Sequence, residues 1–257
     1  MIAETVWLFM HIPKTAGTSL KQILTREYKE FGGLETVYEP DEVAFGPKRK
    51  DAKIYLGHFR YGFHQHLEGN PRYISFIRRP EDQAWSHFHY LQSLNRLPSE
   101  IKDFKDFLHH PYGNNLQLRF ISGIENIAGK EWDVLEIAKQ NIKRDFAFVA
   151  TVEEYNKALL LLKRRLGWHR LPLYHIANVQ HEKPLMTSED YNFANTQLQP
   201  EIELYHFVND WFVKEYLKDN HGDLDLEIFK LENKAFRNLD PLYVRLKTLF
   251  RFNSKNS

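Results

Sequence analysis

Cysteine is absent from the 257-residue sequence, which excludes disulfide bonds and thiolate chemistry. No run reaches the roughly 18 to 20 apolar residues that a helix needs to span a bilayer. Residues 1–4 lead directly into an apolar run, without the basic region and cleavage site of a secretory leader. These absences fit a reducing compartment and predict a cytoplasmic protein.

An excess of charge of one sign is also missing, because 35 Lys and Arg residues balance 34 Asp and Glu residues and leave a formal charge of +1. The balance gives no global bias towards nucleic acid, so any anion must be bound by a local cluster. Hydrophobic residues make up 42% of the chain and aromatic residues 14%, enough to fill one core. We expect a single domain over residues 1–235 and a basic, aromatic tail over residues 236–257.

The first functional motif lies between an apolar run at residues 6–10 and a stretch of helix-forming residues. It consists of Pro13, Lys14, Thr15, Ala16, Gly17, Thr18 and Ser19. The first N–H groups of a helix lack internal partners and attract anions, Gly17 lets the backbone approach a ligand, and Lys14 supplies a cation. The loop predicts a phosphate or sulfate site, with an ordinary capped turn as the alternative. It differs from the nucleotide triphosphatase loop, in which the lysine follows the last glycine.

The second motif begins with another apolar run, Tyr73–Ile77, which predicts a buried strand. Arg78 ends this strand, and Pro80 suits the first turn of the helix that follows. Ser86 lies eight residues after Arg78. A phosphate dianion is bound well by a guanidinium fork and a short hydroxyl donor, so Arg78 and Ser86 are candidates for a second phosphate site.

Strands and helices alternate along the sequence. Strands are predicted over residues 6–11, 53–57, 73–78 and 146–151, helices over 18–29, 81–94, three pieces of 100–144, 153–166 and 199–218, and loops over 32–53, 59–72 and 168–197. The alternation predicts an α/β fold of three layers, with a central parallel sheet flanked by helices. Ligands bind such sheets at the carboxyl ends of the strands, where we expect Lys14, His58 and Arg78 to converge.

The two motifs, in this order and each after a strand, resemble the phosphate-binding motifs of sulfotransferases that use 3′-phosphoadenosine-5′-phosphosulfate (PAPS). The sequence is most similar to carbohydrate sulfotransferases of the heparan and uronyl 2-O-sulfotransferase group. The resemblance implies a P-loop-like fold, PAPS as co-substrate without a metal, and a hydroxyl-bearing acceptor, a glycan in this group. It assigns to the nucleotide Lys14, Thr15, Ala16, Gly17, Thr18, Ser19, Arg78 and Ser86, and also Lys183, which lies where such enzymes often close over the nucleotide.

A Gly-His pair ends the strand before the arginine strand in the same group, and its histidine is the catalytic base. Gly57 and His58 match this pair, whereas Leu56 stands where the heparan enzyme has a second histidine. The resemblance therefore implies that His58 takes the proton of the acceptor hydroxyl. Lys14 then stabilises the negative charge that grows on the leaving oxygen.

The remaining histidines leave alternatives open. His64, His66 or an acidic residue of segment 35–42 is the alternative base. His64 and His66 also suggest a metal site or contacts with an acidic acceptor, although a solvated loop explains them as well. The sequence favours a structural role for His11, and surface or packing roles for His87 and His89.

Several wider alternatives also follow from the sequence. Residues 48–50 either attract an acidic glycan or form a solvated loop, and the segment 242–252 docks on the core, on a partner or on a membrane surface. Golgi relatives of this group carry a membrane anchor that this sequence lacks, so we expect a bacterial, cytoplasmic enzyme, with a soluble lumenal fragment as the alternative. A non-catalytic nucleotide-binding protein and an ATP-dependent phosphotransferase are the alternative functions. The sequence does not define the oligomeric state.

Overall fold

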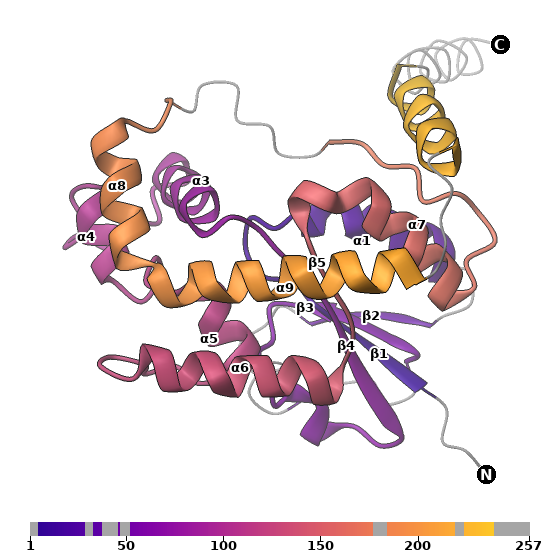
Figure 1. The fold of residues 1–257 in the computed structure, drawn as a ribbon, viewed down its shortest axis with the longest axis horizontal. Coiled ribbons are helices and arrows are strands. Elements are labelled where there is room, and N and C mark those ends of the chain that lie inside the picture. The colour runs from indigo at the N-terminus through magenta and orange to yellow at the C-terminus, as the bar shows by residue number, and fades with distance from the viewer. Residues whose placement is uncertain are drawn as a thin grey trace, which may run out of the picture.

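The structure is a computed structural model that describes residues 5–28, 33–37, 46, 52–176, 184–218 and 224–238. Within them, five parallel strands form a sheet in the order β2-β3-β1-β4-β5 (Figure 1). The strands are β1 (Thr5–Met10), β2 (Leu34–Val37), β3 (Ile54–Gly57), β4 (Asn70–Ile77) and β5 (Phe146–Thr151). Met10 of β1 lies opposite both Gly57 of β3 and Ser75 of β4. The carboxyl ends of these three strands therefore meet at one end of the sheet.

Helices cover both faces of the sheet. They are α1 (Gly17–Tyr28), α3 (Pro80–Ser93), α4 (Phe104–His109), α5 (Leu116–Ser122), α6 (Glu131–Asp145), α7 (Tyr155–Leu166), α8 (Ser188–Gln197) and α9 (Gln199–Lys218), with the 3₁₀ turns η2 (Phe63–His66) and η3 (Val152–Glu154). A further helix spans residues 224–238. α1 and α7 pack on one face and α5 and α6 on the other, while α3, α4 and α8 form a third group (Figure 1). In the described ranges, no helix has the length and apolar character to cross a membrane.

Side chains that alternate along β1 supply the two layers of the core. Leu8 and Met10 join the cluster that includes residues of α5 and α6, whereas Phe9 joins the cluster of α1 and α7. α9 contributes Leu204 to the first cluster and Phe212 to the second, so this helix covers the edge strand β5. Burial of both faces explains why the strands read as continuous apolar runs. The predicted three-layer α/β fold with a central parallel sheet is confirmed.

Two predicted loops contain regular structure. β2 lies within residues 32–53, and its four residues include Glu35 and Thr36, so the sequence has no apolar run to mark it. α8 lies within residues 168–197, where a largely polar sequence hides the helical period. This helix begins at a side-chain cap, because the N–H of Asp190 donates to Oγ1 of Thr187 (3.1 Å).

β4 begins at Asn70, three residues before the predicted start at Tyr73. Pro71 argues against a strand because proline has no N–H to donate. At this end, however, β4 pairs with β1 alone, since pairing with β5 begins only at Tyr73. The missing N–H of Pro71 therefore falls where β5 does not pair with β4.

Gly57 ends β3 where this strand approaches β2 closely. A Cβ at Gly57 would lie 1.9 Å from the carbonyl oxygen of Val37, a backbone atom that moves only with its strand. We expect Gly57→Ala to lower the free energy of unfolding by about 1–3 kcal/mol, the cost of overpacking. Gly33→Ala is the matched control, since its nearest neighbour would lie at 3.8 Å. Chemical denaturation measures both variants, and equal stabilities would contradict the tight approach of β2 and β3.

Candidate functional site

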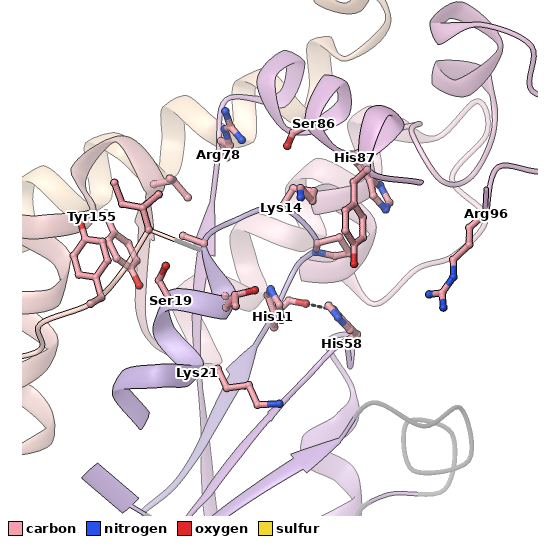
Figure 2. Close-up of a pocket in the computed structure, with 18 residues that line it drawn as sticks. His11, Lys14, Ser19, Lys21, His58, Arg78, Ser86, His87, Arg96 and Tyr155 are labelled. Atoms are coloured by element: carbon pink, nitrogen blue, oxygen red, sulfur yellow. Dashed lines mark hydrogen bonds between the residues drawn. The ribbon is translucent and has the colours of Figure 1, made fainter. Parts of the chain in front are cut away.

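A cavity of about 730 Å³ lies at the carboxyl end of the sheet (Figure 2). It brings together most of the predicted site residues, namely Lys14, Ala16, Gly17, Thr18, Ser19, His58, Arg78 and Ser86. Figure 2 shows Tyr155 and Ser19 towards one end of the cavity, and His58 and Arg96 towards the other. Segments that follow β1, β3, β4 and β5 therefore contribute to one space.

The loop between β1 and α1 has the backbone of an anion site. Lys14 (φ 66°) and Ala16 (φ 63°) both adopt the left-handed conformation, which is unusual for residues other than glycine. Backbone of this kind turns successive N–H groups into a concave surface that attracts anions. The first helical hydrogen bond joins the N–H of Leu20 to the carbonyl of Ala16 (3.2 Å), so the N–H groups of residues 17–19 precede the helical ladder.

Gly17 is required by contact with His11. A Cβ at this position would lie 1.8 Å from Cδ2 of the His11 ring, although the φ angle of Gly17 is not in the left-handed region. Any other side chain would push the ring or the helix aside. The glycine thus lets the start of α1 pack directly against the histidine at the end of β1.

Two hydroxyl groups of this loop are bonded to the protein backbone. The Thr15 hydroxyl donates to the carbonyl of Ile12 (2.8 Å), and this buried side chain does not line the cavity. The Ser19 hydroxyl donates to the carbonyl of His175 (2.9 Å), although Ser19 does line the cavity. Lys183 lies outside the described residues, as do residues 48–50 and 242–252.

Arg78 and Ser86 line the cavity from β4 and α3. Arg78 is the first residue after β4, and Ser86 lies in the second turn of α3, with 8% of its surface exposed. Figure 2 draws both side chains among those that line the cavity. The neighbouring Arg79 is exposed and contacts Tyr205 and Glu153 instead of lining the cavity. The strand end thus separates the two arginines, and only Arg78 faces the site.

His58 follows β3 and is fixed by the backbone of His11. Its Nδ1 donates to the carbonyl of His11 (2.7 Å), and the two rings stack at 4.5 Å. In the neutral ring, Nε2 is then the nitrogen that accepts a proton. Burial lowers the pKa of His58 below its ordinary value, although the bond to the carbonyl partly opposes this effect. His58 is therefore neutral at pH 7, as a general base must be.

Leu56 is the residue at which the sequence resemblance leads to the expectation of a second histidine. Its side chain is fully buried in the core between the sheet and α1. It lies opposite Phe9 in the register of β3 with β1, so it packs under the sheet and not towards the cavity. A histidine at this position would have to be buried in apolar surroundings.

Positive charge dominates the cavity. Lys14, Lys21, Arg78 and Arg96 line it, and none of the described lining residues is a carboxylate. The Lys14 ammonium lies 4.1 Å from the centre of the Tyr90 ring, which can hold the side chain in place. Burial, followed by the charges of His58, Lys21 and Lys14, lowers the pKa of His11 to about 3. Such a lining favours a ligand with several negative charges.

A second cavity of about 440 Å³ adjoins His58. It is lined by His58, Arg60, Tyr61, Gly62, Phe63, Gln65 and His66. His66 therefore faces a cavity, whereas Nδ1 of His64 lies 2.9 Å from the hydroxyl of Tyr73. The histidines of this segment thus point to different surroundings. Over the described part of the chain, no group of three or more His, Asp or Glu side chains has the arrangement of a metal site.

Several lining residues were not found from the sequence. Tyr155 and Tyr174 pack edge to face (5.0 Å between ring centres) at the end of the cavity opposite His58 and Arg96. Tyr90 lies one helical turn after Ser86, so the period of α3 could have identified it. Tyr155 follows β5, and the rule that ligands bind at strand ends could have identified it too. Arg96 and Tyr174 lie on irregular segments, and their placement depends on tertiary packing.

The sequence comparison points to one class of protein, the sulfotransferases. No model of a known protein family matches the sequence. Mouse galactose-3-O-sulfotransferase 2 is 24% identical over 194 residues, which cover 63% of this chain and 49% of the relative. The chain therefore spans about half the length of that curated relative. Among solved structures, the crystal structure of mouse sulfotransferase SULT7A1 complexed with PAP matches with a TM-score of 0.42 and 17% identity, over 76% of this chain and 64% of that chain.

His87 lines the cavity and makes the fold sensitive to acid. Burial lowers its pKa to about 4, although its Nδ1 donates to the carbonyl of Tyr112 (3.1 Å). Below about pH 6.5 His87 is protonated in the unfolded chain, whereas in the folded chain it stays neutral down to about pH 4. The free energy of unfolding therefore decreases as the pH is lowered through this range. We expect His87→Gln to reduce this fall between pH 6.5 and 4.5 by about 1.4 kcal/mol per pH unit at most.

Urea denaturation at a series of pH values measures this effect. His206→Gln is the control, because it makes the same substitution at a histidine whose side chain is exposed. A pH dependence that is the same in His87→Gln and the native protein would show that His87 is protonated equally in both states.

Proposed function

We propose that this protein is a sulfotransferase that moves the sulfuryl group of PAPS to a hydroxyl group of a carbohydrate acceptor. The observation that carries the proposal is that two separate groups of residues suited to binding an anion line one cavity. One is the loop with Lys14 at the start of α1, and the other is Arg78 with Ser86. PAPS has anionic groups at both ends of its ribose, the 5′-phosphosulfate and the 3′-phosphate. The similarity to a galactose-3-O-sulfotransferase supports the same reaction class.

In this proposal the 5′-phosphosulfate binds at the start of α1. The N–H groups of residues 17–19 and the concave backbone around Ala16 are the donors. Lys14 adds a cation on the same loop. The 3′-phosphate binds to the guanidinium of Arg78 and the hydroxyl of Ser86. No metal is needed, since the protein itself supplies the positive charge.

The adenine ring is proposed to bind at the aromatic end of the cavity. Tyr155 and Tyr174 pack together at this end, and Val152 and Ile176 add apolar surface to the lining of the cavity. The hydroxyl of Tyr155 is buried, and it has no hydrogen-bond partner among the described residues. A ring nitrogen of the purine would satisfy this hydroxyl, which otherwise costs free energy in the interior.

The transfer step follows from the position of His58. The acceptor oxygen forms a bond to sulfur while the bond between sulfur and the bridging oxygen breaks, and 3′,5′-adenosine bisphosphate (PAP) leaves. Nε2 of His58 takes the proton of the acceptor hydroxyl, because Nδ1 already carries a proton bonded to the His11 carbonyl. Lys14 and the loop N–H groups offset the charge that grows on the bridging oxygen.

The second cavity is the proposed acceptor site. It touches His58 and contains Arg60 and His66, whose N–H groups can donate hydrogen bonds to a sugar, whereas the Tyr61 hydroxyl donates to Asp145. Tyr61 is fixed there by its backbone, since its N–H donates to the carbonyl of Phe120 (2.9 Å). An acceptor in this cavity would reach His58 from the side away from Tyr155.

The first test of the proposal is the recognition of the 3′-phosphate. We expect the native protein to bind PAP much more tightly than AMP, and Arg78→Ala to lose about 1.5–3 kcal/mol of that preference. Arg79→Ala is the matched control, because Arg79 is exposed and does not line the cavity. Titration calorimetry with PAP, AMP and ATP gives the affinities. Equal binding of PAP and AMP by the native protein, or tighter binding of ATP, would overturn the assignment.

The second test concerns His58 as the base. We expect His58→Ala to keep its affinity for PAP but to lower the transfer rate by about 10²–10⁴. The native rate should rise with pH and level off below the usual histidine range, because burial lowers the pKa of His58 and only the neutral ring accepts a proton.

Transfer from labelled PAPS to a panel of glycans and small hydroxyl compounds measures this rate. His66→Ala is the comparison, since His66 lines the second cavity and is the alternative base. A His58→Ala variant that keeps more than about a tenth of the native rate would be inconsistent with the loss of a general base.

A further inference from the structure

The main chain of Arg78 is held by the side chain of Gln117. Nε2 of Gln117 donates to the carbonyl of Arg78 (2.9 Å), and the N–H of Arg78 donates to Oε1 of Gln117 (2.8 Å). The pairing of β4 with β5 ends one residue earlier, at Ile77 opposite Thr151. The amide of Gln117 therefore takes the place of a neighbouring strand just where the sheet ends. It fixes the backbone of Arg78, the residue whose side chain lines the larger cavity.

Gln117 is held in turn by Glu201 in the first turn of α9. Oε1 of Glu201 accepts from Nε2 of Gln117 (2.8 Å). Oε2 accepts from the backbone N–H groups of Gln117 (2.9 Å) and Leu118 (3.2 Å). Gln117 is 0% and Glu201 1% exposed. Both hydrogens of the Gln117 amide are therefore used, one on Glu201 and one on the Arg78 carbonyl.

The chemistry of the carboxylate sets the orientation of the amide. An ionised carboxylate only accepts hydrogen bonds, so the amide must turn its NH₂ group towards Glu201. That orientation leaves Oε1 for the N–H of Arg78, and the reverse orientation would place two donors against each other. Burial raises the pKa of Glu201 to about 7, while the three donors and the charge of Arg119 favour the ionised form. The carboxylate is buried at a cost that well-packed apolar residues would avoid.

We propose that Glu201 and Gln117 are positioning residues that set the specificity for a 3′-phosphate, because they hold the main chain of Arg78 and thereby its guanidinium at the cavity wall. The inference rests on the proposed function, in which Arg78 binds that phosphate. Neither residue lines the cavity, so each acts only through Arg78. A role in packing alone would lower stability without changing the choice between nucleotides.

The test compares the affinities for PAP and AMP, which differ only by the 3′-phosphate. Glu201→Gln keeps the size of the side chain but replaces one acceptor oxygen by a donor, so the Gln117 amide loses its fixed orientation. We expect the ratio of PAP to AMP affinity to fall by about tenfold, which corresponds to the net contribution of about one hydrogen bond. The affinity for AMP should stay within about twofold, since the 5′ site is untouched.

Gln117→Asn is the second variant, because the shorter amide cannot bridge Arg78 and Glu201 together. Asn141→Ala is the matched control. Asn141 is also a buried amide, on α6, and its Nδ2 donates to the carbonyls of Ile121 (3.1 Å) and Ser122 (3.2 Å) at the end of α5, away from Arg78. Its loss should lower the melting temperature without changing the PAP to AMP ratio. Calorimetry at about pH 8 keeps Glu201 largely ionised.

The outcomes separate the inference from the proposed function. A native protein that does not distinguish PAP from AMP would overturn the proposed function, and the inference with it. A native protein that does distinguish them, together with an unchanged ratio in a folded Glu201→Gln or Gln117→Asn variant, would overturn the inference alone. A ratio that falls equally in Asn141→Ala would show a general effect of loosening α5 and would also overturn the inference. Circular dichroism and AMP binding establish whether each variant is folded. If Glu201→Gln does not fold, the PAP to AMP ratio of Gln117→Asn decides the test.

Discussion

The pairing of β1 with both β3 and β4 is the constraint on which the site depends. Met10 lies opposite Gly57 on one side and Ser75 on the other, so the residues after each strand leave the sheet at nearly the same level. A slip of one residue in either ladder would move a strand by about 3.3 Å and turn its side chains to the opposite face. Lys14, His58 and Arg78, spread over 65 residues, face one cavity because neither ladder slips.

His11 links the loop between β1 and α1 to the proposed base, His58. Its N–H donates to the carbonyl of Gly57 (2.7 Å), its own carbonyl accepts from Nδ1 of His58 (2.7 Å), and its ring fills the space beside Gly17. The orientation of His58 and the packing of α1, the helix that follows the loop, are thus set by one residue. The sequence favours a structural role for His11, and these contacts explain how such a role affects the site directly.

The sequence was most informative where a long apolar run ends at a polar motif. β1, β4 and β5 are such runs and β3 is a shorter one, so the parallel sheet could be predicted, and with it the positions of Lys14 after β1, His58 after β3 and Arg78 after β4. β2 and α8 could not, because a four-residue strand with Glu35 has no periodic signal and α8 is polar on most sides. The motif also did not predict where each of its side chains points, since the Thr15 hydroxyl donates to the carbonyl of Ile12 and not into the cavity. The pairing of Gln117 with Arg78 depends on an approach of α5 to β4 that local sequence does not encode.

The two cavities have different walls, and among the described residues His58 alone lines both. Of the described residues that line the smaller cavity, a ligand in the larger one therefore contacts only His58, and the reverse also holds. In the proposed reaction, neither substrate has to be present to build the binding surface of the other. Such an arrangement corresponds kinetically to random addition, in which nucleotide and acceptor bind in either order and meet only at the imidazole between them.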